Sequence, residues 1–254
     1  MKVIGIVPAR MAATRFPGKP LYPILGRPMI DHVWQRATNY KGWDGLYLAT
    51  CDREIEDFGL SKKWPVIMTS NQHTRCLDRV AEAAEKCGQS LDKNDIIVCV
   101  QGDEPLLKPE MIEASIRPLR EDPEARGTVL AMHIVHEDQF RNTDIIKVIH
   151  DMKGNVLYTS RSPIPYAKSF SPELGARRIY GIFAFRWEFL KLFTSMPESP
   201  LEKAESCDSN RICDHGLRQR IAPYPFEPSF SVDSPADIAR VESAMKNDAL
   251  WGTY

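Results

Sequence analysis

The sequence predicts an α/β protein in which helices flank a mixed, mostly parallel sheet, in a single domain over residues 1–254. In the first half of the chain, short apolar runs alternate with helical patterns, which is typical of parallel strands joined by crossover helices. From residue 127 onward, apolar runs follow one another without a helix long enough for a crossover. This change predicts a smaller antiparallel sub-region at about residues 130–180, a candidate lid or dimer surface. No linker-like composition separates the two halves.

The elements of the first half follow from periodicity and punctuation. Short apolar runs predict buried strands at 3–8, 45–50, 65–69 and 95–105, the last ending in an acidic turn. Apolar residues at helical spacing predict helices at 28–39, 75–88 and 109–119. Pro28 and Pro109 suit first helical turns, and Gly88 suits a helix end.

The second half has shorter connections. Strands are expected at 127–135, 145–151, 155–160 and 180–185, with a hairpin-like turn at "DMKGN" and a loop over 160–178. Helices are expected at 186–193 and 200–216, the second ended by Gly216. The chain closes with "SVDSPADIARVESAM", which predicts Asp233 at a strand end and then a Ser-Pro-x-Asp helix start.

Composition and charge exclude several classes of protein. The net charge is −1 over 254 residues, so no global field favours nucleic acid or a membrane surface. No apolar run approaches the roughly 20 residues that span a bilayer, and no signal peptide is expected ahead of the first strand. The six cysteines form no C-x-x-C pair, which argues against zinc and a disulfide framework. A cytoplasmic protein is expected.

The stretch "VPARMAATRFPGKPL" at 7–21 follows the first buried strand and carries Arg10, Arg15 and Lys19. Ligands of parallel α/β sheets bind beyond the carboxyl ends of the strands, and three cations there favour a phosphate site over a solvated loop. Backbone N–H groups of 9–14 are expected to form an anion nest. The stretch matches neither phosphate-binding pattern rich in glycine, which disfavours an ATPase or a dinucleotide dehydrogenase.

Two acidic residues are candidates for Mg²⁺. Asp103 follows a buried strand in "VQGDEPLL", and Asp233 is expected at a second strand end. Carboxylate oxygens suit Mg²⁺, which also bridges to phosphates. Asp103 alone could equally start a turn before Pro105, but two acids beside a phosphate loop predict metal-assisted nucleotidyl transfer.

Polar side chains follow the third strand in "TSNQHTRCLDR". Thr69 and its neighbours could bind a base or ribose, and Arg75 and Arg79 add charge, whereas His73 could simply cap the next helix. Arg161 is either a contact to a sugar or carboxylate or a member of a surface ion pair.

These stretches, in this order, resemble the 3-deoxy-manno-octulosonate (Kdo) cytidylyltransferases, also called CMP-Kdo synthetases. The family signature is close to I-P-A-R-x-x-S-T-R-[LF]-P-G-K-P-L, matched here by "VPARMAATRFPGKPL". Further matches cover 26–37, 100–112, 160–166, 181–190, 200–205 and 232–241. The resemblance extends over essentially the whole chain.

The resemblance implies a nucleotide-diphospho-sugar transferase-like fold, usually homodimeric, and transfer of CMP from CTP to an acidic sugar with release of pyrophosphate. The acceptor is Kdo or a related 2-keto-3-deoxy sugar acid, activated for lipopolysaccharide or capsule synthesis. The implied roles are triphosphate binding by Arg10, Arg15 and Lys19, nucleotide contacts by Pro8, Ala9 and Thr69, a sugar contact by Gln101, Mg²⁺ binding by Asp103 and Asp233, and acceptor contacts by Arg79 and Arg161. Arg10, Lys19, Asp103 and Asp233 are the implied catalytic residues, and no general base is nominated.

Three stretches depart from the family pattern in the acceptor region. Arg75, Cys76 and Leu77 replace Ser-Gly-Thr, Ile179 replaces a histidine and Ser209 replaces a glutamine. These changes predict an altered acceptor, and Arg75 beside Arg177, Arg178 and Arg211 could suit a phosphorylated or phosphonate acid. A non-catalytic nucleotide-binding subunit is an alternative of another class. The intact phosphate and metal motifs argue against it.

Overall fold

The computed structural model describes residues 1–12 and 15–254 of the chain. Its strands are β1 (Val3–Pro8), β2 (Pro23–Ile24), β3 (Arg27–Pro28), β4 (Gly45–Thr50), β5 (Val66–Met68), β6 (Ile96–Val100), β7 (Gly127–His133), β8 (Lys147–His150), β9 (Val156–Ser160), β10 (Arg177–Arg186) and β11 (Arg220–Tyr224). Its α-helices are α1 (Met29–Thr38), α2 (Arg53–Ser61), α3 (Cys76–Lys86), α4 (Pro109–Glu121), α5 (Glu137–Arg141), α6 (Trp187–Ser195), α7 (Pro200–Glu205), α8 (Ser209–Asp214) and α9 (Ile238–Lys246). Short 3₁₀ helices lie at η1 (Lys19–Leu21), η2 (Pro172–Leu174) and η3 (Pro235–Asp237).

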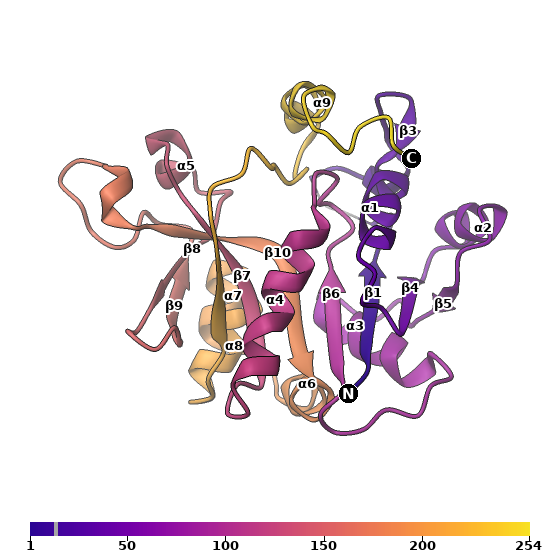
Figure 1. Ribbon diagram of the computed structural model, residues 1–254, viewed down its shortest axis with the longest axis horizontal. Helices are drawn as coiled ribbons and strands as arrows, with labels where there is room; N and C mark the ends of the chain where they lie inside the picture. Colours follow the sequence, from indigo (N-terminus) through magenta and orange to yellow (C-terminus); the bar gives the residue numbers. More distant parts are fainter. Residues whose placement is uncertain (13–14) are drawn as a thin grey trace.

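The main sheet has the strand order β11-β7-β10-β6-β1-β4-β5. β1 is parallel to β4 and β6, β4 to β5, and β11 to β7. Only β10 runs antiparallel to its two neighbours on this path, β6 and β7. The predicted mixed, mostly parallel sheet flanked by helices is therefore confirmed (Figure 1).

Alternating side chains of the central strands pack on opposite faces of the sheet. In β6, Ile96, Val98 and Val100 join one core cluster, whereas Ile97 and Cys99 join the other. The first cluster also takes apolar side chains of α1 and α4, and the second takes those of α3 and α6. Both faces are covered by helices, which explains why these strands are apolar without a polar side (Figure 1).

The smaller antiparallel region is an extension of this sheet. β8 and β9 form a hairpin, and β8 also pairs with the first residues of β10. Figure 1 shows this hairpin and α5 to one side of the main sheet. Phe140 and Phe170 pack beside the long loop that precedes β10, with ring centroids 5.2 Å apart.

Two predictions of secondary structure are wrong. The single helix expected at 200–216 is two helices, α7 and α8, because Ser206 adopts a left-handed backbone (φ 51°) that ends the first. The strand expected before Asp233 is absent from the described backbone between β11 and η3. α2 and β11 were not predicted, and β10 is longer than the apolar run that indicated it.

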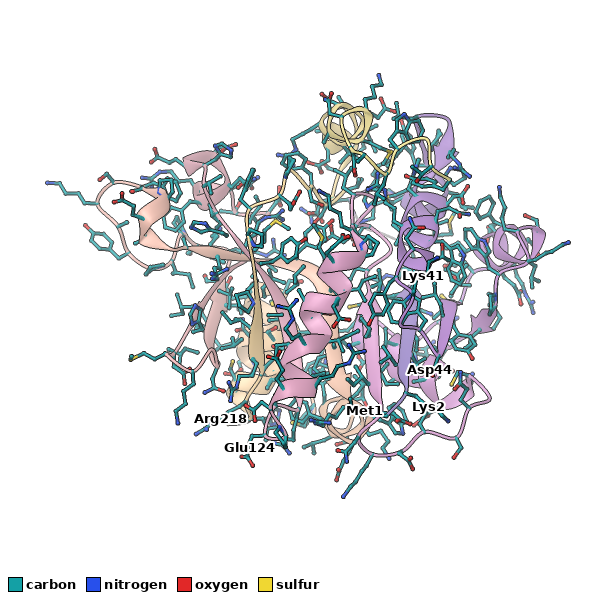
Figure 2. The ribbon with its side chains drawn as sticks, in the orientation of Figure 1. Met1, Lys2, Lys41, Asp44, Glu124 and Arg218 are labelled. Atoms are coloured by element: carbon teal, nitrogen blue, oxygen red, sulfur yellow. The ribbon has the colours of Figure 1, made fainter. Side chains whose placement is uncertain are left out.

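No helix within 1–12 and 15–254 combines the length and the apolar character needed to cross a membrane. Figure 2 shows Lys2, Asp44, Glu124 and Arg218 toward the lower end of the molecule in that view. Asp44 there accepts a 2.7 Å hydrogen bond from the backbone N–H of Val3, at the start of β1. The predicted site residues that follow β1 and β6 lie at the opposite ends of these strands.

Candidate active site

Two adjoining cavities lie beyond the carboxyl ends of β1 and β6 and share Gln101 and Asp103. The first cavity has a volume of about 220 Å³, and its lining includes Pro8, Ala9, Arg10, Lys19, Arg75, Cys76 and Arg79. The second cavity has a volume of about 210 Å³, and its lining includes Glu104, Asp144, Arg161, Arg178, Ile179, Asp233 and Arg240. Most of the residues predicted to bind substrates therefore line one of two connected spaces.

The loop after β1 is folded back on itself. The N–H of Gly18 donates to the carbonyl of Met11 at 3.0 Å, and Gly18 has φ +75°, a backbone region that favours glycine. The buried ring of Phe16 anchors the loop in a third apolar cluster. This turn brings Lys19 from η1 to the lining of the first cavity, beside Arg10.

Two of the backbone N–H groups expected in the anion nest at 9–14 have partners within the protein, and the nest stays a prediction. The N–H of Ala9 donates to the carbonyl of Ala49, and the N–H of Met11 donates to Asp52 Oδ2. Residues 13 and 14 lie outside the described part of the chain. Side-chain cations, rather than these two amides, are the groups available to an anion.

Lys19 joins the phosphate loop to the acidic residues. Its Nζ donates to Asp103 Oδ2 at 2.8 Å and to the carbonyl of Val232 at 2.7 Å. Burial disfavours the ammonium, but the charge of Asp103 and the hydrogen bond to it outweigh burial, so the pKa of Lys19 is raised. The cation therefore sits beside Asp103 at the boundary of the two cavities.

Asp103 and Asp233 lie together although they are far apart in the sequence. The N–H of Val232 donates to the carbonyl of Asp103 at 3.0 Å, and Lys19 lies against both segments. Burial, and next the charge of Asp103, raise the pKa of Asp233. Asp233 does not end a strand, contrary to the prediction; the capping box of Ser234 and Asp237 fixes the turn that carries it.

Arg15 lines neither cavity but connects two carboxylates. Its guanidinium lies 2.8 Å from Asp233 Oδ1 and 2.6 Å from Asp144 Oδ1. Arg15 was predicted from the sequence and Asp144 was not, because Asp144 belongs to no recognisable motif. Glu104 was also missed, although it adjoins Asp103: its buried carboxylate accepts from the N–H of Gly181 and the hydroxyl of Ser231.

Two predicted site residues lie away from both cavities. Thr69 is buried, and its hydroxyl lies against the carbonyl of Thr50 and the guanidinium of Arg79. Ser209 is fully buried in α8. Thr69 was expected after the third strand and Ser209 within the helix 200–216, and the sequence could not show that either side chain is buried.

The four arginines expected near the acceptor all have partners within the protein. Arg75 pairs with Glu198 at 3.0 Å and Arg211 pairs with Glu202 at 2.7 Å, so acidic partners neutralise both. Arg177 donates to the carbonyl of Ala131 and Arg178 to that of Ser229. These contacts weaken the support that the four arginines give to a phosphorylated acceptor, which stays a prediction.

The carboxylates fit a magnesium ion by the chemistry of their donor atoms. Asp103 and Asp233 supply hard oxygen ligands whose mutual repulsion a cation would relieve. Within residues 1–12 and 15–254 no cluster of three or more acidic, histidine or cysteine side chains could enclose a metal ion. A two-carboxylate site suits a cation that takes its remaining ligands from phosphates and water.

The chain is similar in sequence to known cytidylyltransferases. A profile described as cytidylyltransferase matches residues 4–220. The 3-deoxy-manno-octulosonate cytidylyltransferase of Thermodesulfovibrio yellowstonii is 38% identical over 257 residues, covering 96% of this chain and 98% of that protein. The protein of the same name from Geobacter sulfurreducens is 37% identical, covering 97% of this chain and 100% of that one.

Solved structures extend the comparison to the fold. A CMP:2-keto-3-deoxy-manno-octonic acid synthetase complexed with CTP has a TM-score of 0.86 and 32% identity, covering 97% of this chain and 99% of that one. A 4-diphosphocytidyl-2C-methyl-D-erythritol synthase, 13% identical with a TM-score of 0.63, shares the fold alone. The chain belongs to the family of 3-deoxy-manno-octulosonate cytidylyltransferases.

Proposed function

We propose that this chain transfers CMP from CTP to Kdo, or to a closely related 2-keto-3-deoxy sugar acid, and releases pyrophosphate. The observation that carries the proposal is the contact of Lys19 with Asp103 where the two cavities adjoin. This places a cation and a carboxylate between a space lined by the phosphate loop and a second space for the acceptor. The reaction is assigned to the cytoplasm and to the assembly of surface polysaccharide.

The first cavity is assigned to CTP. Arg10 and Lys19 line it and can neutralise the triphosphate, Arg10 with a planar fork of donors and Lys19 as a compact charge. The backbone at Pro8 and Ala9 faces the nucleotide. Arg15 acts from outside this cavity, because its guanidinium holds Asp233 and Asp144 in place.

Asp103 and Asp233 would hold Mg²⁺. When bound, this ion would neutralise charge on the phosphates and lower the pKa of the acceptor hydroxyl. The carboxylates of Asp103 and Asp233 lie beside the ammonium of Lys19. Both a cation and the ligands of a metal ion would therefore be in place where negative charge develops on the phosphates during the reaction.

The second cavity is assigned to the acceptor. The hydroxyl oxygen of the acid forms a bond to the α-phosphorus, the bond to the bridging oxygen breaks, pyrophosphate leaves and the hydroxyl proton passes to solvent. Gln101 is shared by both cavities and is the side chain best placed to orient the attacking hydroxyl. Ile145, Ile146 and Ile179 give this cavity an apolar side, so a histidine contact to the acceptor is absent at position 179.

The experiment is a screen of pyrophosphate release. Each nucleoside triphosphate is tested with Kdo, its 8-amino analogue, a sialic-type acid and a phosphorylated small acid, in Mg²⁺ and after chelation. We expect turnover with CTP and Kdo or its analogue, and loss of turnover after chelation. Asp103→Asn should lower kcat by about 10²–10³-fold, whereas Asp57→Asn, on the exposed side of α2, should not. Higher kcat/KM with another acid class, or no release with any acid, would refute the assignment.

We propose, as a separate point, that the chain forms a homodimer through the β8–β9 region. β9 pairs only with β8, and Met152, Leu157 and Tyr166 are exposed apolar side chains in or beside this hairpin. Light scattering should give twice the mass of the chain, and Leu157→Asp should give the monomer mass. A monomer in the unmodified protein would refute the proposal.

A further inference from the structure

Two cations, the buried Lys147 and the half-buried Arg161, hold the loop between α5 and β8 by its carbonyl groups. Lys147 Nζ donates to the carbonyls of Asn142 at 2.8 Å and Ile145 at 2.6 Å. Arg161 Nη1 donates to the carbonyl of Thr143 at 3.0 Å and lies 3.5 Å from that of Asp144. All four carbonyls of the loop 142–145 thus face one of two positive charges.

The two cations are joined to each other and to the rest of the fold. The third hydrogen bond of Lys147 runs to the carbonyl of Arg161 at 2.5 Å, so the ammonium uses all its donors on backbone oxygens. Glu205 in α7 accepts from the N–H of Arg161 at 2.8 Å, and the Arg161 side chain donates to the carbonyl of Glu205 at 2.9 Å. We call Lys147, Arg161 and loop 142–145 the carbonyl clasp.

The loop held in this way touches both halves of the site. Asn142, Asp144 and Ile145 line the second cavity. The carboxylate of Asp144 also binds Arg15 of the phosphate loop, and Arg15 in turn binds Asp233. A shift of loop 142–145 would therefore change the wall of the second cavity and the position of Arg15 together.

We propose that Lys147 is a positioning residue, which with Arg161 fixes loop 142–145. Asp144 in this loop then holds Arg15 against Asp233. In this way the clasp couples the acceptor cavity to the phosphate loop. The inference rests on the proposed function for the identity of the substrates, but not for the structure of the clasp. Lys147 is completely buried and has no carboxylate among its hydrogen-bond partners. An apolar side chain would avoid the cost of burying an ammonium, which indicates that the three carbonyl contacts themselves are what this position requires.

The charge of Lys147 also makes the clasp sensitive to pH. Burial lowers the pKa of Lys147 to about 8, the charge of Arg161 acts in the same direction, and Glu205 opposes both. Arg178, its register partner on β10, is the charged residue that faces it from the neighbouring strand. Above pH 8 the neutral amine offers two N–H groups to three carbonyls, so we expect the KM of the acceptor to rise through this range.

The kinetic test compares Lys147→Met, Asp144→Asn and the double variant with Lys153→Met, an exposed lysine in the turn of the same hairpin. We expect Lys147→Met to raise the KM of the acceptor by about tenfold or more, as removing outer supports of a site typically does. Lys147→Met should also change the KM of CTP, because it shifts Arg15 through Asp144. This change should largely disappear in the Asp144→Asn background, since both substitutions act through Arg15. Lys147→Gln keeps two N–H donors without a charge. Its KM for the acceptor should lie between those of the unmodified protein and Lys147→Met, and this KM should not rise above pH 8.

A lysine that only stabilised the fold would give a different result. In one such result, the urea midpoint of Lys147→Met would fall while the KM values of CTP and of the acceptor stayed the same. In another, the KM of CTP would change in both single variants, and the double variant would show the product of the two changes. Either outcome would overturn the proposal.

A substrate-free measurement separates failure of the clasp from failure of the proposed function. Hydrogen–deuterium exchange of amides 142–147 should be faster in Lys147→Met and Lys147→Gln than in the unmodified protein, and unchanged in Lys153→Met. Unchanged exchange in both Lys147 variants overturns the clasp whatever reaction the protein catalyses. Absence of pyrophosphate release in the unmodified protein refutes the function, and the exchange result still decides the clasp.

Discussion

Replacing Arg211 by methionine should destabilise the protein strongly, because it breaks a buried ion pair. Arg211 donates to both carboxylate oxygens of Glu202 at 2.7 Å, and their side chains are 2% and 0% exposed. Removing one partner of such a pair costs about 3–5 kcal/mol, since the other charge stays buried. Arg75, with Nε 3.7 Å from Glu202, compensates in part, so we expect the low end, about 3 kcal/mol.

The assay is urea unfolding together with the thermal midpoint. For a chain of this size about 3 kcal/mol corresponds to a fall of roughly 6–12 °C. Arg53→Met, which removes an exposed pair with Glu56, should cost under about 1 kcal/mol. The double variant Arg211→Met/Glu202→Gln should recover most of the loss, since the only partner of Arg211 then left charged among the described residues is the partly exposed Asp78. Arg211→Met could instead lower the free energy of unfolding by less than about 1 kcal/mol and raise the KM of the acceptor. That result would give Arg211 the anion-binding role that the sequence suggested.

Three further outcomes are expected. Lys19→Met should lower kcat by about 10²–10³-fold, while the exposed Lys41→Met leaves it unchanged; equal kcat values would contradict the role of Lys19. Gly181→Ala should lower kcat/KM by about tenfold or more, because a Cβ there would lie 2.6 Å from the side-chain oxygens of Gln101 and Glu104, and unchanged kinetics would show that both move freely. Burial raises the pKa of Asp208 to about 6, so the folded protein binds a proton more readily than the unfolded chain and the contribution of Asp208 to stability is lost as pH rises from about 4 to 6. Urea unfolding at both pH values should show this loss in the unmodified protein, and its persistence in Asp208→Asn would assign it to another group.

The sequence predicts best where structure and chemistry are local. β1 and β6 are continuous apolar runs. Asp103 follows β6 within a turn, and the loop after β1 carries Lys19 in η1 back to the same edge of the sheet, where the two side chains meet. The helix expected at 200–216 fails for a local reason that composition does not reveal. Ser206 enters the left-handed region, and the buried polar side chains around it favour two short helices over one.

Contacts that depend on tertiary structure could not be read from the chain. Arg75 and Arg211 look like available cations in sequence, but Glu198 and Glu202 neutralise them from another segment. Arg161 was expected near the acceptor, and it does line the second cavity, yet its guanidinium is occupied by backbone carbonyls. A charge pattern indicates which residues are charged, not which charges remain for a ligand.

β10 lies between β6 and β7 in the sheet but comes late in the sequence, and this affects how the chain folds. Residues 1–121 contain β1, β4, β5 and β6, yet the second edge of β6 has no partner until β10, which begins at residue 177. β7 and β11 join the main sheet through β10, so among the described strands this one closes the gap between two incomplete sheets. An apolar strand edge left open for so much of synthesis favours contact with other chains. The late arrival of β10 also makes its docking a slow, non-local step. Nascent chains that stop before residue 177 should therefore be the species that chaperones bind and that aggregate.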